Sequence, residues 1–360
     1  MRRFIAFPYR LHRRHPQWIA PLLLEQKKIF NPAKNKFLQH CAYALFLLLE
    51  GKQVIGRIAA FINQVANEYR QEQIGFFGHY ECINDPDAAL LLLKKAEDWL
   101  RVREMHMMRG PWNFVSQDFG LIIEGYDVAP TVLSSWNPPY YNEQLLQFGL
   151  HKAKDMLVYH CDISRGYIIP PRFINFTERI AERYRIRIRP LDMKNLIRDA
   201  RIIVRLTNIS LSRNWGFYPI AEEEAEDIAA DLKAIVHPEA VLIAEIDDKP
   251  IGYILAIPDV NHLLKKSHGR LGPITLLRLL SGIKSLNRYR IWAMGIVPEY
   301  QKKGISILLF KRLNEVLAPR QVYVEANWVL EDNALMNNAL RQLQFDLVKR
   351  YRVYEKELIN

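Results

Sequence analysis

The sequence predicts a mixed α/β protein in which two similar domains, each built on a mixed sheet, follow one another along the chain. With 360 residues, the chain exceeds the usual length of a single domain. Its two halves also present the predicted elements in one shared order: strand, helices, hairpin, strand, helix, strand, helix, strand. Because 49% of the residues are hydrophobic, each half can fill a core. We expect one domain over residues 1–165, a linker over 166–184 and a second domain over 185–360.

The elements of the first half follow from hydrophobic periodicity and from turn signals. Glu50-Gly51-Lys52 separates two apolar runs, which predicts a β-hairpin. Asp85 and Pro86 are start signals for the helix that follows them. The predicted strands are 3–9, 43–50, 53–61, 74–82, 105–108 and 157–161, and the predicted helices are 22–30, 88–104 and 140–150.

The second half repeats this order after a segment that carries Gly166, Pro170 and Pro171, which favour a linker. A hairpin is predicted around residues 247–250, and the basic, apolar stretch 259–287 resembles an insertion. The predicted strands are 186–190, 241–246, 251–257, 291–297, 321–329 and 345–355, and the predicted helices are 173–183, 193–208, 222–236, 305–317 and 332–343.

Charge and cysteine content narrow the classes of partner and compartment. The net charge of +11 favours an anionic partner, such as a nucleotide cofactor, an acidic substrate, tRNA or a membrane surface, although many enzymes are simply basic. Cys41, Cys82 and Cys161 are isolated, so they indicate neither a disulfide framework nor a metal site. Because we find no signal peptide and no apolar run long enough to cross a bilayer, we expect a cytoplasmic protein. The histidines show no paired spacing, so we expect no bound metal.

A strand, a turn and a helix form the stretch around which the second domain is expected to be organised. The apolar strand 291–297 ends at Pro298, and Gln301-Lys302-Lys303-Gly304-Ile305-Ser306 opens a helix. A helix N-terminus has backbone N–H groups without internal partners and a positive dipole end, so it suits an anion. Gly304 has no Cβ, which would let a ligand approach the backbone, and Lys302 and Lys303 add positive charge. This arrangement predicts a pyrophosphate site.

The same stretch resembles motif A of the GNAT N-acetyltransferases, whose Gln/Arg-x-x-Gly-x-Gly/Ala loop holds the pyrophosphate of acetyl-CoA. Gln301 and Gly304 match this motif, and Ser306 replaces the usual Gly or Ala. The resemblance implies a tandem pair of GNAT-like domains that uses acetyl-CoA, or another acyl-CoA, as co-substrate. The residues expected to bind it are Met294, Ile296, Val297, Gln301, Lys302, Lys303, Gly304, Ile305, Ser306 and Asn333.

A second segment, 333–345, is similar to motif B of the same family. Asn333 matches the asparagine that faces the pantetheine arm, and Phe345 matches the closing aromatic residue. Leu340 and Gln344 replace the family's tyrosine and glycine. Because leucine cannot donate a proton, another group protonates the leaving thiolate, or the thiolate leaves unassisted.

Acyl transfer to an amine requires a neutral amine, a polarised thioester carbonyl and close positioning. Since a lysine-like amine has a pKa of about 10.4, a base must take its proton. Glu325 is the first candidate for this base and Glu299 the second, with a structural strand carboxylate and a surface turn residue as their respective alternative roles. Gly295 is expected to permit a bulge that directs a backbone N–H toward the carbonyl.

The first half lacks the predicted pyrophosphate site, because residues 82–88 are acidic where motif A would lie. Residues 140–150 still resemble motif B, so we interpret the first domain as a degenerate copy that keeps the fold. The long loop 110–141 combines aromatic and polar side chains, which is typical of binding sites. Its residues either shape an acceptor pocket or fix the domain interface. The candidates are Trp112, Asn113, Asp118, Trp136, Tyr140 and Tyr141.

We therefore expect an acyltransferase that moves an acetyl or other acyl group from acyl-CoA to an amine by direct transfer in a ternary complex. The expected acceptor is an amine-bearing small molecule, peptide or protein. Two alternatives stay open. The basic stretch 265–290 would suit a tRNA-dependent aminoacyl (Fem-like) transferase, and Leu340 and Gln344 keep open a non-catalytic module that binds coenzyme A.

Overall fold

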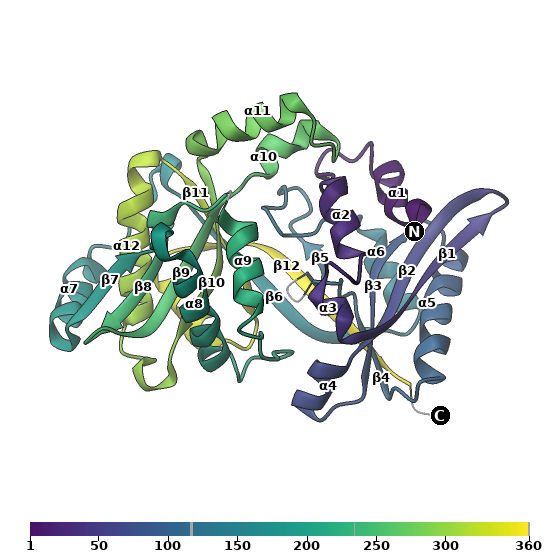
Figure 1. Cartoon of the computed structure of the whole chain (residues 1–360), viewed down its shortest axis with the longest axis horizontal. Coiled ribbons are helices and arrows are strands. Elements are labelled where there is room, and N and C mark those ends of the chain that lie inside the picture. Colours follow the sequence, from purple (N-terminus) through teal and green to yellow (C-terminus); the bar gives the residue numbers. More distant parts are fainter. Residues whose placement is uncertain (116–117, 234, 359–360) are drawn as a thin grey trace. The chain divides into compact units, whose positions relative to one another are not determined.

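The computed structural model of the chain describes residues 1–115, 118–233 and 235–358 and contains two compact units (Figure 1). Unit 1 comprises Met1–Asp155, Asn261–Leu280 and Lys349–Asn360, and unit 2 comprises Met156–Val260 and Ser281–Val348. These units differ from the predicted ranges 1–165, 166–184 and 185–360, because the chain passes between the units more than once.

Unit 1 is built on a sheet of order β1-β2-β3-β4-β12, and β5 also pairs with β12. Its neighbouring strands are antiparallel except β3 and β4, which are parallel and are connected by α5. The strands are β1 (Cys41–Glu50), β2 (Gln53–Asn63), β3 (Ile74–Cys82), β4 (Met107–Gly110), β5 (Leu121–Glu124) and β12 (Asp346–Glu357). The helices are α1 (Arg2–Leu11), α2 (Leu23–Ile29), α3 (Lys36–Gln39), α4 (Gln64–Arg70), α5 (Pro86–Arg101), α6 (Tyr140–Gln147), α10 (Asn261–Leu264) and most of α11 (Pro273–Gly282).

The first helix corrects the sequence prediction for residues 3–9, which form part of α1 and not a strand. Phe4, Phe7 and Pro8 recur at helical spacing and are buried together with Ile5. Over so short a segment, apolar residues at these positions fit the period of a strand as well as that of a helix. Periodicity therefore did not discriminate between the two.

Unit 2 is built on a sheet of order β6-β11-β10-β9-β8-β7, in which only β10 and β11 are parallel. The strands are β6 (His151–Asp162), β7 (Ile186–Pro190), β8 (Val241–Ile246), β9 (Lys249–Pro258), β10 (Arg288–Ile296) and β11 (Tyr323–Leu330). The helices are α7 (Arg172–Tyr184), α8 (Leu196–Ser210), α9 (Glu224–Lys233), α12 (Ile305–Leu317) and α13 (Ala334–Gln342). Much of the predicted linker is α7, whose Phe173 and Ile180 belong to the core of unit 2.

The two faces of the unit 2 sheet differ in their side chains. One face carries Ile291, Val324 and Ala326, which share an apolar core with α12 and α7. Successive residues of a strand point to opposite faces, so the neighbouring Arg290 and Glu325 lie on the other face. The second face is therefore polar where β10 and β11 pair.

Two strands run from one unit into the other. β6 begins in unit 1 and pairs with β11 in unit 2, and β12 begins in unit 2 and pairs with β4 and β5 in unit 1. The order β2-β3-β4-β12 in unit 1 thus corresponds to β9-β10-β11-β6 in unit 2, with one parallel pair at the same place in each. This correspondence confirms the prediction of two similar mixed α/β domains in tandem.

A buried ion pair fixes α8 to the strands of unit 2. Asp199 is fully buried and accepts hydrogen bonds from Arg189 at 2.7 and 3.0 Å, and Arg189 also donates to Glu245 at 2.8 Å. Burial by itself would raise the pKa of Asp199, but the hydrogen bonds and charge of Arg189 hold it below its ordinary value of 3.8. The ionised carboxylate therefore contributes to stability.

For Asp199→Asn we expect the free energy of unfolding to fall by about 2–3 kcal/mol, because Arg189 loses its buried carboxylate. Since the folded-state pKa is the lower one, this contribution is complete above about pH 4 and is lost as the pH falls further. Urea unfolding should separate the variant from the wild-type protein at pH 7 and much less at pH 3. Glu222→Gln, in an exposed pair with Arg205, is the control and should change stability by less than about 0.5 kcal/mol. Equal stabilities of D199N and wild type at pH 7 would contradict this account.

Candidate active site

The parallel strands β10 and β11 pair only over their first four residues. Residues 288–291 pair with 323–326, and no further register pair joins these two strands, all of whose residues are described. Beyond this point β10 remains paired with β9, and β11 remains paired with β6. The strands therefore separate after Ile291 and Ala326. We call the unpaired edges, residues 292–296 and 327–330, the β10–β11 split.

Backbone groups of β10 are directed to this split. Val297 donates its N–H to Ile251 of β9 at 2.9 Å, so this group is already bonded. Because alternate residues of a strand direct their N–H and C=O groups to opposite sides, Met294 and Ile296 direct theirs away from β9 and toward the split. Of the three residues predicted here, Met294 directs its N–H and C=O to the split, Ile296 directs its N–H there while its carbonyl accepts the Gln301 side chain, and the Val297 N–H is taken up by β9.

The irregularity in β10 lies at Trp292 and not, as predicted, at Gly295. The register with β9 shifts between Ile291 and Ala293, which makes Trp292 the extra residue of a bulge. Gly295 has a packing role instead, since a Cβ there would lie 2.2 Å from the Ser210 Oγ of α8. Only a glycine lets α8 pack this closely on the strand.

The start of α12 presents backbone donors that have no acceptor. Gly304 is the N-cap, and no side chain caps the helix. Within the described chain, the N–H groups of residues 302–307 make no hydrogen bond, whereas the Leu308 N–H bonds the Gly304 carbonyl at 3.2 Å. Lys302 and Lys303 are exposed beside these donors, and the Lys303 Nζ lies 4.6 Å from the centre of the Tyr300 ring. Unbonded amides, the helix dipole and two cations together suit a pyrophosphate.

Gly304 fits this turn for a reason that differs in part from the prediction. Its φ of +80° is a left-handed conformation, which glycine adopts without steric cost. The space that a Cβ would take is filled by α7, because that atom would lie 2.4 Å from the Ile180 Cδ1 and 2.9 Å from the Phe176 Cε1. The prediction that a ligand approaches this side of Gly304 is therefore wrong. The unbonded N–H groups of residues 302–307 are the part of the predicted site that remains for a ligand.

Gln301, Ile305 and Ser306 have different roles around this turn. The Gln301 side chain donates to the Ile296 carbonyl at 3.0 Å and so closes the loop between β10 and α12. Ile305 is 1% exposed and anchors the first turn of α12 in the core. Ser306 is half-buried at the second helical position, where its N–H is among the unbonded donors.

Glu325 lies beside the point where the strands separate, and it is fully buried. The Asn327 Nδ2 donates to its Oε1 at 3.1 Å, and the Tyr323 hydroxyl donates to its Oε2 at 3.4 Å. Burial and the charge of Glu325 raise the pKa of Tyr323, so this hydroxyl keeps its proton and acts as a donor. Glu299, by contrast, is exposed in the 3-10 turn Pro298–Tyr300. The first candidate base is thus held at the split, and the second lies on the surface.

Sequence reasoning missed two residues beside Glu325. Arg290 of β10 and His160 of β6 are its register partners on the neighbouring strands, so all three side chains lie on the polar face of the sheet. Arg290 is 1% exposed, and its guanidinium lies 5.2 Å from the centre of the Trp328 ring. The sequence suggested Arg290 only as part of a basic surface.

Arg288 is not part of that basic surface either. Its guanidinium lies 4.0 Å from the centre of the Tyr323 ring and 3.5 Å from the Asp259 carboxylate. The interpretation of 265–290 as one continuous basic stretch is therefore wrong at its C-terminal end, where the cations belong to the sheet. The alternation of polar and apolar residues in Tyr323-Val-Glu-Ala-Asn327 was the signal that could have placed Tyr323 and Asn327 beside Glu325.

Three residues of the second motif have structural roles in unit 2. Asn333 caps α13, since its side chain accepts the Met336 N–H at 3.1 Å. Leu340, in the place of the family's tyrosine, is fully buried in the core. Gln344 takes a φ of +60°, the conformation for which glycine is the usual residue at this place. The predicted contact of Asn333 with a pantetheine arm stays a prediction.

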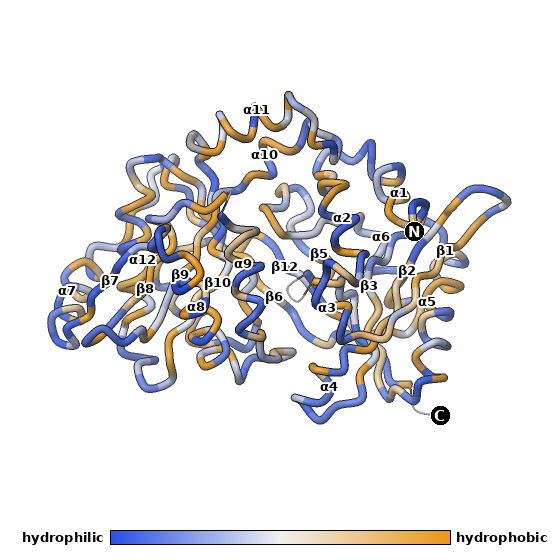
Figure 2. The backbone as a smooth tube through the Cα atoms, in the orientation of Figure 1, coloured by the Kyte–Doolittle hydropathy of each residue, from blue (hydrophilic) through white to orange (hydrophobic). Residues whose placement is uncertain are grey.

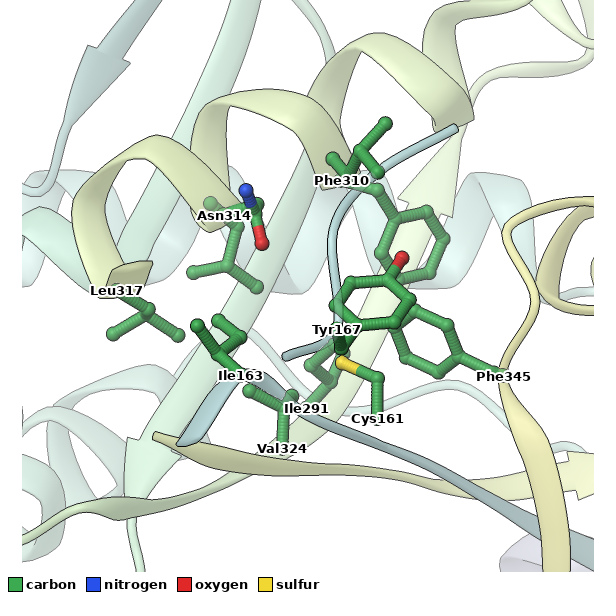
Figure 3. Close-up of a pocket in the computed structure, with 11 residues that line it drawn as sticks. Cys161, Ile163, Tyr167, Ile291, Phe310, Asn314, Leu317, Val324 and Phe345 are labelled. Carbon is green, nitrogen blue, oxygen red and sulfur yellow. The ribbon is translucent and has the colours of Figure 1, made fainter. Parts of the chain in front are cut away.

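A small cavity lies on the apolar side of the unit 2 sheet, beneath the C-terminal half of α12 (Figure 3). Its volume is about 20 Å³, and none of the residues that line it is charged. Among its polar groups, the Tyr167 hydroxyl donates to the Leu343 carbonyl at 2.9 Å. Burial raises the pKa of the Cys161 thiol, so this group stays protonated. The cavity is a gap in an apolar core and does not suit a pyrophosphate.

Three of the residues predicted to bind the acceptor hold their own loop together in unit 1. Trp112 is buried and stacks on Phe119, with ring centres 4.2 Å apart. Asn113 accepts the His79 N–H at 2.6 Å and donates to Asp118 at 2.8 Å. These contacts account for Trp112, Asn113 and Asp118 as structural residues, and their role in acceptor binding stays a prediction.

Tyr141 belongs to a largely buried polar group that sequence reasoning missed, and the half-buried Trp136 lies beside it. The Tyr141 hydroxyl donates to the Glu81 Oε2 at 2.7 Å, and the His12 Nε2 lies 2.5 Å from the same oxygen. Burial alone would raise the pKa of Glu81, but His12 and Arg57 lower it below its ordinary value. The Trp136 ring lies 5.6 Å from that of His12.

In the described parts of the chain, no group of three or more His, Cys, Asp or Glu side chains is placed to hold a metal ion.

The place in unit 1 that corresponds to the start of α12 has its donors satisfied. Asp85 caps α5, and its Oδ1 accepts the Asp87 N–H at 2.9 Å and the Ala88 N–H at 3.1 Å. Nearby, the Tyr140 hydroxyl donates to the Cys82 carbonyl at 3.0 Å. A carboxylate thus takes the position that an anion would need, which supports the interpretation of unit 1 as a copy without an acyl-CoA site.

Comparison with known proteins agrees with this geometry. The model of the acetyltransferase (GNAT) family matches residues 206–345, which include the β10–β11 split and α12. The chain is 30% identical over 366 residues to Protein YghO of Escherichia coli, covering 99% of this chain and 93% of that protein. It is 31% identical over 367 residues to the bacterial ceramide synthase of Caulobacter vibrioides, covering 99% of this chain and 95% of that protein.

Among solved structures, the chain resembles a tandem GNAT protein from the clavulanic acid biosynthesis pathway. The TM-score is 0.50 at 12% identity, and the match covers 89% of this chain and 84% of that one, which shows a shared fold. Together with the two relatives, these matches show that the chain belongs to the acetyltransferase (GNAT) family as a member with two such domains in tandem.

Proposed function

We propose that this protein transfers an acyl group from acyl-CoA to a primary amine, and that unit 2 carries the reaction. The observation that carries the proposal is the β10–β11 split, which begins next to Glu325 and lies on the strand that leads into the unbonded N-terminus of α12. The amides of residues 302–307 with Lys302 and Lys303 would hold the pyrophosphate. The N–H and C=O of Met294 and the N–H of Ile296 would hold the extended pantetheine arm, as a neighbouring strand would.

The residues of unit 2 also supply what the transfer requires. The amine nitrogen attacks the thioester carbonyl carbon, a C–N bond forms and the C–S bond breaks, so that the sulfur leaves as a thiolate. Glu325 takes the proton that the amine loses, and Tyr323 and Asn327 hold its carboxylate in place. Since Leu340 cannot donate, the thiolate takes its proton from water. A thiol with a pKa of about 8.5 is an acceptable leaving group without specific help.

The acceptor that we propose is the amine of a long-chain amino alcohol, with a fatty acyl-CoA as donor. This part of the proposal draws on the relative that bears the name of a ceramide synthase, because a ceramide is the amide of such a base with a fatty acid. The identity of 31% over 99% of this chain supports a shared class of reaction. The split and the polar face that contains Glu325 fit the formation of an amide.

The test is an assay of thiol release by the purified chain with acyl-CoA donors of 2 to 18 carbons against a panel of amines. The panel contains a long-chain amino alcohol, a lysine-containing peptide and a short amine. Turnover that is fastest with the long-chain base and a long-chain donor supports the whole proposal. Turnover of the peptide or the short amine alone would overturn the choice of acceptor. Binding of coenzyme A without turnover of any amine would overturn catalysis and favour the non-catalytic module.

A further inference from the structure

The insertion between β9 and β10 carries an exposed apolar helix, α11. Ile274, Leu277 and Leu280 recur at every third position and are 73%, 67% and 67% exposed, and Leu276 beside them is 47% exposed. Figure 2 shows hydrophobic residues along much of this helix. A contiguous group of large apolar side chains on a helix surface marks a site of interaction rather than an ordinary solvated face.

The charged residues of the segment that contains α11 all have one sign. Residues 260–298 contain seven Lys and Arg residues and no Asp or Glu. Arg288 and Arg290 lie in the sheet, but Lys265, Lys266 and Arg270 are exposed just before α11. A partner of α11 must therefore tolerate or prefer positive charge next to its apolar contact.

The base of the insertion is fixed to unit 1. The Asn261 Nδ2 donates to the Pro130 carbonyl at 3.0 Å, and the Leu23 N–H donates to the Gly269 carbonyl at 2.8 Å. Gly269 itself packs closely, because a Cβ there would lie 2.5 Å from the Tyr9 ring. The exposed apolar side chains of α11 thus belong to an anchored helix and not to a loose segment.

We infer that residues 265–280, which we call the α11 surface, bind the surface of a membrane that contains anionic lipids. An apolar helix face flanked by Lys and Arg is the pattern of helices that lie in the plane of the lipid headgroups, with the apolar side chains inserted and the cations among the phosphates. With ten residues, α11 is too short to cross a bilayer, and no helix in the described residues is long and apolar enough to do so. A second copy of this chain would bring the same cations together and repel.

This inference rests on the proposed function in one respect. A long-chain base and the amide made from it both reside in membranes, so an enzyme that acts on them gains from binding at the membrane surface. The physical argument for the α11 surface, however, uses only its exposed apolar residues and its cations. Binding to lipid can therefore be measured without acyl-CoA and without an amine.

The experiment is sedimentation of the full chain with vesicles of phosphatidylcholine alone or with about one third phosphatidylglycerol, at low and high salt. We expect binding to the anionic vesicles that weakens at high salt, as for any attraction between exposed charges. Lys265→Gln, Lys266→Gln and Arg270→Gln together should weaken it about 100-fold, since each cation near such a surface contributes roughly fivefold. Ile274→Ser, Leu277→Ser and Leu280→Ser together should weaken it at least about tenfold.

Matched controls remove the same groups elsewhere. Leu90, Leu91 and Ile168 are exposed to a similar degree, and Lys52, Lys194 and Lys249 are exposed cations outside the α11 surface. Changing the three apolar residues to serine, or the three lysines to glutamine, should leave vesicle binding unchanged. Failure of the wild-type chain to bind anionic vesicles, equal binding to neutral vesicles, or equal losses in the controls would overturn the inference. So would a change from dimer to monomer in the serine variant without any vesicle binding, because α11 would then be an interface between copies.

The proposed function is tested separately, by turnover of a short-chain acyl-CoA with an amine dissolved in detergent. The α11 variants should keep this activity while losing vesicle binding. Vesicle binding without turnover of any amine would leave the α11 surface supported and the proposed reaction refuted.

Discussion

Replacing Ser306 with aspartate is expected to abolish the binding of acyl-CoA and to leave the fold intact. Position 306 is the second residue of α12, where a carboxylate stabilises a helix by about 0.3–1 kcal/mol. The same carboxylate would satisfy the amides of residues 302–307 and repel a pyrophosphate. Since two like charges 4 Å apart repel by about 4 kcal/mol at an effective dielectric constant of 20, we expect affinity to fall at least about 100-fold. Calorimetric titration with coenzyme A measures the affinity, and thermal unfolding checks the fold.

Ser306→Ala is the matched control, because it removes the hydroxyl without adding a charge and should bind coenzyme A within about threefold of wild type. A substitution of Gly304 would not serve as well, since a Cβ there would strike Ile180 and disturb the packing of α7. If S306D binds coenzyme A as tightly as S306A, the pyrophosphate does not lie at the start of α12. The proposed function would then lose the observation on which it depends.

Glu325→Gln is expected to lower kcat by about two to three orders of magnitude, the usual contribution of a general base. Glutamine keeps the size of the side chain, its Oε1 can still accept from Asn327, and its amide NH2 can donate to the Tyr323 hydroxyl, so the sheet should stay folded. KM for acyl-CoA should hardly change, because the cofactor is held by other residues.

Glu299→Gln is the control for this experiment, since Glu299 is exposed in a turn and should not affect kcat. Initial rates across pH 5–9 with saturating acyl-CoA make the comparison. A normal kcat for E325Q would return Glu325 to its alternative role as a structural carboxylate of β11. A loss of activity in E299Q instead would make Glu299 the candidate general base in place of Glu325.

The part of the site that depends on local signals could be predicted from the sequence. The strand before Pro298, the turn and the helix after Gly304 are fixed by neighbouring residues, and the structure confirms each of them. What lies against that turn could not be predicted. Ile180 and Phe176 reach Gly304 from α7, more than 120 residues earlier in the chain, and nothing in the sequence around either residue indicates the contact.

The same limit explains the misplaced bulge and the missed neighbours of Glu325. A glycine in a strand suggests an irregular backbone. Gly295 is instead required because Ser210 of α8 packs closely against it, and the bulge falls on the bulky Trp292. Arg290 appeared to be a surface cation because basic residues precede it. Only the pairing of β10 with β11 shows that it is buried beside a carboxylate.

The exchange of β6 and β12 has a consequence for how the protein is made. The residues that lead up to β4 belong to unit 1, yet the strand beside β4 is β12, where the Glu355 carboxylate accepts a hydrogen bond from Arg109 at 2.7 Å. On the ribosome, β4 must therefore keep an uncovered edge until β12 has been made, because Glu355 follows Arg109 by 246 residues. Unit 1 is thus completed only after the strands of unit 2 have been made, and a nascent chain stalled before residue 349 leaves the edge of β4 open to aggregation.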